Sequence, residues 1–137
     1  MYNIKSKSMI TYELMINDWV SYIGNGKQEK RKVLEITCLK QVELWDGENM
    51  SSWFLVGEKY IEPIPLTSEI LKANGFEEDP EDGTMCWGNK ELEEVTWRGT
   101  ILKIDSLSAS LELVSCMYVH QLQHALKLCG IGIEIRL

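Results

Sequence analysis

The sequence predicts an α+β fold made mainly of antiparallel sheets, with two short helices at about residues 67–74 and 118–129. Short segments of alternating apolar and polar residues, rich in β-branched and aromatic side chains, are separated by turn residues along most of the chain. Only two segments show a helical spacing of apolar residues together with end signals. Strands, a helix, strands, a helix and a last strand favour α+β over alternating α/β.

Three strands are expected in the first half of the chain, after a mixed segment at residues 1–13 that predicts a loose end or an edge strand. Apolar and aromatic residues bounded by turn residues predict the first and third strands. The second alternates without interruption, so we expect one continuous strand there. The three predicted strands are residues 16–24, 32–45 and 52–56.

The long second strand has a uniformly apolar face formed by Leu34, Ile36 and Cys38, and we expect that face to point inward. The segment KQEKRK before it, residues 27–32, carries a local net charge of +3 and follows the turn residues GNG. We therefore interpret residues 27–32 as a turn or the tip of a hairpin.

The first helix has the clearest end signals in the chain. Residues 59–66 lead into it through two prolines, which cannot donate to a ladder, so this segment should lie at a sheet edge or leave the sheet. Thr67 suits the N-cap, and Gly75 suits the left-handed position after the last turn. We expect Phe76 to fold back onto Leu71.

A second antiparallel set is expected after an acidic segment at residues 76–83, which we interpret as a solvated loop because the ligand alternation of a calcium loop is missing. Apolar residues change parity within the middle strand, and a bulge near Gly99 would reconcile them. The last strand places Ile131, Ile133 and Ile135 on one face. The predicted strands are residues 84–88, 94–105, 110–115 and 131–137.

Length and composition predict a single globular domain over residues 1–137, with 45% hydrophobic and 26% charged residues. The net charge of −7 argues against general nucleic-acid binding. No segment has the roughly 20 apolar residues of a membrane helix, and no apolar core of a secretion signal is present. We expect a cytoplasmic protein whose four cysteines are reduced and pack as small apolar residues.

Three blocks carry a resemblance: INDWVSY at residues 16–22, IEPIPLTSEILKANGF at 61–76 and YVHQLQHAL at 118–126. They are similar to blocks of short uncharacterised proteins carried by phages, prophages and mobile elements of gut bacteroidetes, and the match runs in order over residues 14–137. The resemblance implies a phage or mobile-element origin and carries over no catalytic residue. It does not support His124, which replaces the usual Asn.

The opening block also suggests a fold for the first half of the chain. A short strand, a turn and a long alternating strand are how small SH3-like barrels begin. We therefore expect residues 14–62 to form an SH3-like curled sheet. This is an analogy of fold and implies no activity.

Two histidines, His120 and His124, stand four residues apart in the second predicted helix and share one of its faces. The apolar stripe of that helix lies on the other side, so we expect both imidazoles at the surface or at the rim of a ligand site. Metal coordination would need further ligands, and the sequence has no third His and no CxxC pair. We expect no metal and no cofactor.

The five tryptophans are the other candidate feature. Core packing accounts for most of them. Trp45 beside Asp46 and Trp53 beside Ser52 could instead rim a pocket for a planar ligand such as a nucleobase. The candidate ligand-binding residues are Trp45, Trp53, His120 and His124.

Three functions remain open at this point, and a non-enzyme is favoured because no GxSxG, GxGxxG or Walker A motif is present. The first is a binding protein of a phage or mobile element in the bacterial cytosol, a counter-defence protein that sequesters a nucleotide-type signal or binds a host defence protein. The second is a structural module that forms homo-oligomers by edge pairing of residues 131–137. The third is a small hydrolase that uses His120 or His124.

Overall fold

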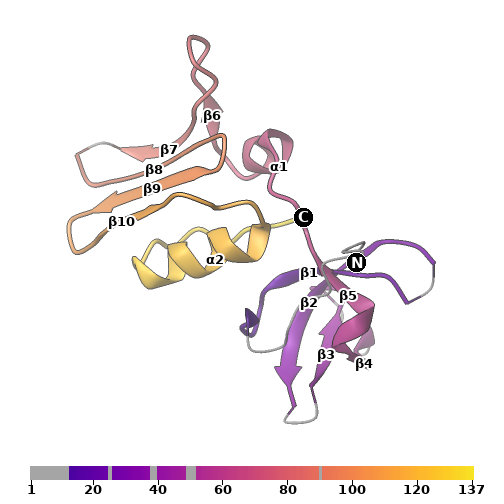
Figure 1. Cartoon of the computed structure of the whole chain (residues 1–137). Helices are drawn as coiled ribbons and strands as arrows, with labels where there is room; N and C mark the ends of the chain where they lie inside the picture. Colours follow the sequence, from indigo (N-terminus) through magenta and orange to yellow (C-terminus); the bar gives the residue numbers. More distant parts are fainter. Residues whose placement is uncertain (1–12, 25, 38–39, 49–51, 90) are drawn as a thin grey trace, which may run out of the picture. The chain divides into compact units, whose positions relative to one another are not determined.

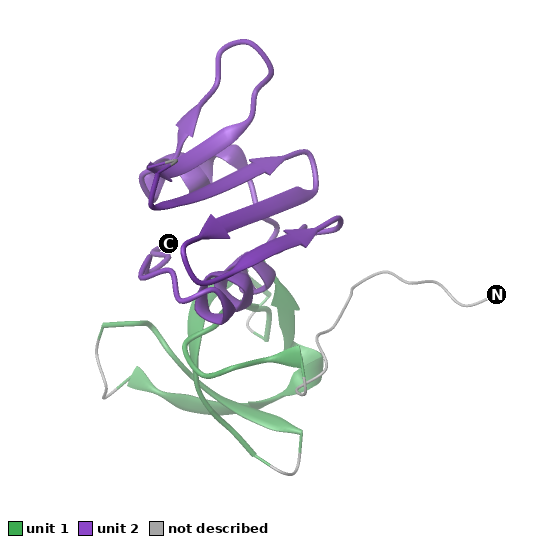
Figure 2. Ribbon diagram, turned by 90° about the vertical axis from the view of Figure 1, so that its left-hand side faces the viewer, with its two compact units in different colours: residues 1–64 green, residues 65–137 purple. Residues whose placement is uncertain are grey.

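The computed structural model consists of two compact units, Met1–Ile64 (unit 1) and Pro65–Leu137 (unit 2) (Figures 1 and 2). Each unit has its own five-stranded antiparallel sheet, and unit 2 also carries two α-helices, so the predicted α+β class is confirmed. The expectation of a single domain stays a prediction. The described residues are 13–24, 26–37, 40–48, 52–89 and 91–137.

In unit 1 the first four strands form a meander, and the fifth strand returns to pair with the first. The strand order is β4-β3-β2-β1-β5. A 3₁₀ turn, η3 (Glu58–Tyr60), connects β4 to β5. This is the arrangement expected of an SH3-like sheet, and β5 with Pro63 lies at the sheet edge as predicted. The strands are β1 (Trp19–Tyr22), β2 (Glu29–Ile36), β3 (Gln41–Trp45), β4 (Phe54–Gly57) and β5 (Ile61–Pro63).

The predicted continuous strand over residues 32–45 is wrong, because the chain reverses within it. β2 and β3 are antiparallel neighbours, and the Thr37 N–H donates to the Gln41 carbonyl at 2.9 Å across the reversal. Lys40 takes a left-handed φ of +57° there, which a residue with a Cβ adopts uncommonly. No Gly, Pro, Asn or Asp marks this turn, so the sequence pattern could not predict it.

The predicted inward face of β2 is also wrong in part. The register with β3 shifts between Val33 and Glu35, so the strand bulges at Leu34. The bulge leaves Val33 fully buried and Leu34 only partly buried. Ile36 still packs against the core as expected, and Cys38 lies outside the described residues.

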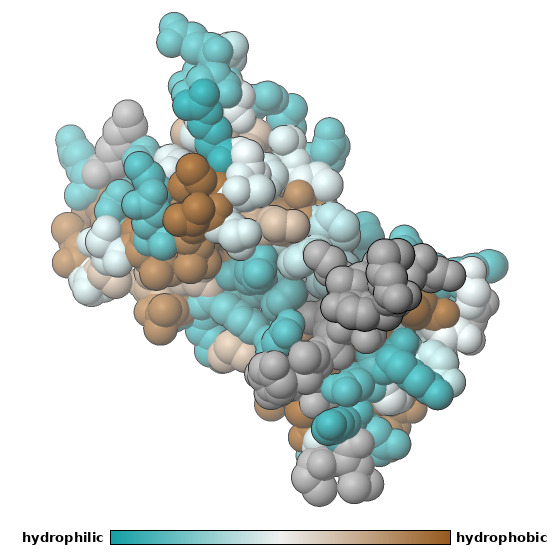
Figure 3. Space-filling view, in the orientation of Figure 1, coloured by the Kyte–Doolittle hydropathy of each residue, from teal (hydrophilic) through white to brown (hydrophobic). Residues whose placement is uncertain are grey.

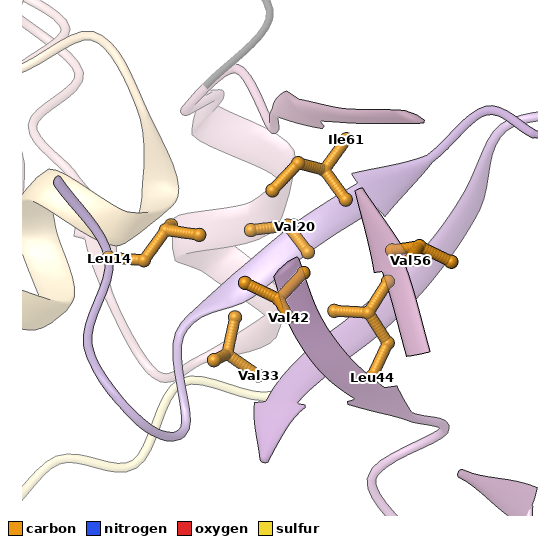
Figure 4. Close-up of a cluster of buried hydrophobic side chains, with 7 residues drawn as sticks. All are labelled: Leu14, Val20, Val33, Val42, Leu44, Val56 and Ile61. Carbon is orange, nitrogen blue, oxygen red and sulfur yellow. The ribbon is translucent and has the colours of Figure 1, made fainter. Parts of the chain in front are cut away.

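The core of unit 1 is a compact aliphatic cluster enclosed by the curled sheet (Figure 4). Burial of one such side chain contributes roughly 1.5–3 kcal/mol. Tyr22 and Phe54 close one side of it, edge to face, with ring centroids 4.9 Å apart. The cluster consists of Leu14, Val20, Val33, Val42, Leu44, Val56 and Ile61.

Unit 2 is a meander of five strands in sequential order with α1 and α2 beside it (Figure 1). The predicted strand over residues 94–105 is two strands, joined by a two-residue loop at Gly99 and Thr100. Gly99 has φ +65°, which suits the first position of a type II′ hairpin loop. The elements are α1 (Ser68–Ala73), β6 (Glu77–Glu78), β7 (Met85–Asn89), β8 (Glu93–Arg98), β9 (Ile101–Ser106), β10 (Ser110–Leu113) and α2 (Val119–Leu128).

One face of this sheet is apolar in every strand from β7 to β10, and α2 packs against β9. The opposite face carries mostly polar and charged residues. Two residues of the acidic segment 76–83 form the short strand β6, which the loop prediction missed. The apolar face consists of Met85, Trp87, Val95, Trp97, Leu102, Ile104, Leu111 and Leu113.

Both helices end with the same backbone motif. The Thr67 hydroxyl accepts from the Ile70 N–H at 3.2 Å, so the predicted N-cap of α1 is confirmed. At its other end the Phe76 N–H donates to the Leu71 carbonyl at 3.0 Å, and Gly75 has φ +91°, as predicted. α2 repeats the motif around Gly130, with φ +70°.

The predicted last strand, residues 131–137, does not form, and this segment has no ladder partner within the described residues. Ile131 and Ile135 are buried, so the expected parity is right although the expected strand is wrong. Edge pairing between two copies of the chain through this segment stays a prediction.

Candidate ligand-binding face

The basic segment at residues 27–32 lies mostly within β2, so its prediction as a turn is wrong. Lys30, Arg31 and Lys32 pair with consecutive residues of β1. Since neighbouring strand residues point to opposite faces, Arg31 shares the face of the core residue Val20. Lys30 and Lys32 therefore share the outer face of unit 1.

Lys32 stands between two tryptophans on this outer face. It pairs with Trp19 of β1 and with Trp45 of β3. Its Nζ lies 5.3 Å from the centroid of the Trp19 ring, within the range of a cation–π interaction. A Cβ on Gly47 would lie 3.1 Å from Cη2 of Trp19, so the turn after β3 packs closely against that indole.

Trp53 extends the same row by one strand. The β3–β4 ladder ends at Leu44, and beyond it the Ser52 hydroxyl donates to the Asp46 carboxylate at 2.8 Å. Trp45 is the last residue of β3 and lies next to the inward-facing Leu44, so it faces outward. Trp53 directly precedes β4 and is exposed, and the Ser52–Asp46 contact brings its segment close to the end of β3. We name Trp19, Lys32, Trp45 and Trp53 the tryptophan–lysine row.

Exposure differs along the tryptophan–lysine row. Trp19 and Lys32 are 6% and 8% exposed, whereas Trp53 is 52% exposed. The Trp45 Nε1 is buried and has no hydrogen-bond partner among the described residues. A buried unpaired N–H is uncommon in a folded protein. The two tryptophans named as candidates from the sequence are thus brought together, with Trp53 as the accessible member.

The outer face also carries a pair of acidic side chains. Glu35 and Glu43 are directly paired across β2 and β3. Removal from water raises the pKa of Glu43, and the charge and hydrogen bond of Glu35 raise it further. The two carboxylates lie further along β2 and β3 than the row, so the basic and aromatic residues occupy one part of the face.

Charge is divided unevenly between the units. Unit 1 has eight Lys and Arg against nine Asp and Glu, a net charge of −1. Unit 2 has six against twelve, a net charge of −6. The acidity that argued against nucleic-acid binding therefore belongs mainly to unit 2.

The histidines belong to α2 of unit 2. His120 is buried at 5% exposed, so the prediction that both imidazoles lie opposite the core is wrong for His120. Its ring stacks on Tyr118, with centroids 5.9 Å apart, and meets His124 edge to face at 5.6 Å. The buried arc of α2 is wider than the predicted stripe and consists of Val119, His120, Leu122, Ala125 and Leu126.

Metal and thiol chemistry find little support in the described part of the chain. No three His, Cys, Asp or Glu side chains of these residues are grouped to hold a metal ion. Burial raises the pKa of Cys116 to about 11, which keeps this thiol protonated and a poor nucleophile near neutral pH. Burial also raises the pKa of Cys129.

No family model matches the chain, and neither does any curated protein or solved structure. Among the described residues no helix is long and apolar enough to cross a membrane.

Proposed function

We propose that this chain is a non-enzymatic binding protein of a phage or mobile element, and that unit 1 holds a nucleotide-type ligand on its outer face. The observation that carries the proposal is the tryptophan–lysine row, with Lys30 beside it on β2. A nucleotide combines a planar base with an anionic phosphate. Aromatic faces next to ammonium groups match both parts.

Trp53 is the residue best placed to stack on a base. It is 52% exposed, and the adjoining Trp45 is held with its indole N–H buried. Stacking of one base on one aromatic side chain contributes about 1–3 kcal/mol. Trp45 and the accessible Trp53 therefore offer an aromatic platform for a planar ligand.

Lys30 is the residue best placed to meet a phosphate. It is exposed on the same face as Lys32, two positions along β2. Lys32 itself lies near the Trp19 ring, where it adds positive potential beneath the row.

The biological role that we propose follows from the resemblance to phage and mobile-element proteins. In the bacterial cytosol, a protein that sequesters a nucleotide-type signal would act as a counter-defence protein without catalysing a reaction. The same exposed row could instead contact a host defence protein, since Trp side chains also anchor protein interfaces.

Isothermal titration calorimetry tests the proposal. The full chain is titrated with a panel of mononucleotides, cyclic dinucleotides and short oligonucleotides. We expect one ligand class to bind, with Trp53→Ala weakening it about 5- to 100-fold. Tyr60→Ala is the matched control, because Tyr60 is also an exposed aromatic of unit 1 and lies outside the row. Lys30→Glu should weaken binding more than Lys103→Glu in unit 2.

If no nucleotide binds, the nucleotide proposal is overturned. Capture of a host protein by the wild-type chain but not by Trp53→Ala would then assign the row to protein recognition. Equal affinity of the wild type and Trp53→Ala for a nucleotide would place the ligand elsewhere on the molecule.

A further inference from the structure

A pocket of about 790 Å³ lies within unit 2, beside Trp87 of β7. This volume is in the range of small-molecule sites, which is roughly 300–1,000 Å³. The pocket lies where β7 passes the end of α1, and Gly75, Glu77, Glu93 and Leu107 are among the residues that line it.

Trp87 provides the aromatic wall. It belongs to the apolar face of the sheet, where it pairs with the buried Val95, but it is itself only partly buried. Gly75 lies against one edge of the Trp87 indole, because a Cβ at Gly75 would lie 3.8 Å from Cδ1 of Trp87. The absence of a side chain at Gly75 leaves space next to Trp87.

Two carboxylates in the pocket lining give it negative charge. Within the described part of the chain, Glu77 and Glu93 form no ion pair. Among the described cations of unit 2, Lys72 pairs with Glu78 at 2.8 Å and Arg98 pairs with an aspartate of the β6–β7 turn. The net charge of −6 on unit 2 acts in the same direction.

Two leucines that line the pocket are largely exposed to solvent. Leu92 is 58% exposed and Leu107 is 83% exposed. Hydrophobic side chains reach the surface elsewhere in unit 2 as well, in small groups among hydrophilic ones (Figure 3). What distinguishes these two leucines is that they line the same pocket as an indole and two unpaired carboxylates.

We propose that this pocket binds a small organic cation with an apolar body, of the alkylated ammonium type. The cation would lie over the Trp87 ring, where cation–π attraction is strongest among the aromatic side chains. Glu77 and Glu93 would balance its charge, and its alkyl groups would cover Leu92 and Leu107. A hydrated metal ion would leave the indole and the leucines without a role. The proposal is independent of the one made for unit 1.

Choline is the probe, and its neutral carbon isostere 3,3-dimethylbutan-1-ol is the ligand control. Titration of the full chain is followed by the indole N–H signals in NMR spectra, with the Trp87 signal assigned by Trp87→Phe. We expect choline to shift the Trp87 signal saturably and the isostere to bind at least about tenfold more weakly. Glu93→Gln should weaken choline binding about threefold or more, and Trp53→Ala in unit 1 should leave it unchanged.

Trp87→Ala should abolish choline binding, and circular dichroism shows whether this variant is folded. If Trp87→Ala is unfolded, Trp87→Phe replaces it as the test variant. Trp87→Phe keeps an aromatic ring and should bind choline more weakly than the wild type. Equal binding of choline and the neutral isostere would overturn the proposal, as would the lack of a saturable shift of the Trp87 signal in millimolar choline.

Discussion

The side-chain amide of Asn74 bonds the backbone of Arg136 in both directions. Its Nδ2 donates to the Arg136 carbonyl at 2.9 Å, and its Oδ1 accepts from the Arg136 N–H at 2.7 Å. The amide therefore presents the same donor and acceptor as one residue of a neighbouring strand. Nδ2 also donates to the Ile70 carbonyl at 2.8 Å, so Asn74 connects the C-terminal segment to α1.

Replacement of Asn74 by Ala should lower the free energy of unfolding by about 2 kcal/mol, because three hydrogen bonds of about 0.5–1.5 kcal/mol each are lost at a partly exposed site. Chemical denaturation gives the value. Hydrogen exchange of the Arg136 amide should accelerate as well. Asn89→Ala is the matched control, since the Asn89 side chain accepts only a local bond from the Glu91 N–H. Unchanged protection of Arg136 in Asn74→Ala would contradict this prediction.

Glu43→Gln should stabilise the protein at neutral pH. A carboxyl whose pKa is raised in the folded state contributes stability below its unfolded pKa, and that contribution is lost as the pH rises through the folded pKa. The variant removes this loss and the repulsion with Glu35. Its melting temperature should exceed that of the wild type at pH 7, and the difference should shrink as the pH falls below the raised pKa. A constant difference over the whole pH range would argue against the coupling.

Gly88→Ala should destabilise unit 2 by about 2 kcal/mol or more, since Gly88 has φ +99°, where a side chain is strained, and no room for a Cβ. A Cβ there would lie 2.3 Å from the Glu93 carbonyl oxygen. Gly57→Ala is the control, because Gly57 has no atom within 4 Å of such a Cβ and no positive φ. Thermal unfolding of both variants tests the difference, and equal melting temperatures would rule out the strain.

Lys32→Met tests the role of this lysine in the proposed nucleotide binding. Removing one member of a buried charged interaction is destabilising, so we expect the melting temperature to fall, and the affinity is compared at a temperature where the variant is still folded. Nucleotide affinity should fall, and its dependence on salt should weaken, because the ammonium beneath the row is gone. Lys59→Met, whose Nζ lies 5.0 Å from the Tyr60 ring in the same unit, is the matched control. Full affinity in Lys32→Met would exclude Lys32 from the site.

Local signals predicted the ends of α1 well. Thr67, Gly75 and Phe76 act over three to five residues, within one turn of backbone, so their roles follow from sequence spacing. The two missed reversals show where such signals stop. Gly99 lacks the Asn-Gly or Asp-Gly pairing that marks a hairpin most strongly, and the turn near Lys40 has no turn residue in its described part.

The candidate residues divide in the same way. Trp45 and Trp53 were named from their neighbours Asp46 and Ser52, and those neighbours do form a hydrogen bond. Lys30 and Lys32 were assigned to a turn, because a run of polar residues after GNG gives no hint of strand pairing. No signal near Trp87 in the sequence indicates the pocket.

The sequence by itself determined the fold class, the two helices, the capping of α1 and the apolar parity of the C-terminal segment, because each depends on residues a few positions apart. The tertiary structure decided that Lys32 stands between Trp19 and Trp45, that His120 is buried, and that the segment around Arg136 bonds to Asn74 rather than to a strand. Those outcomes depend on which strands pair and in which register. Contacts between residues far apart in the chain set that register, and the periodicity of apolar residues along the sequence does not reveal those contacts.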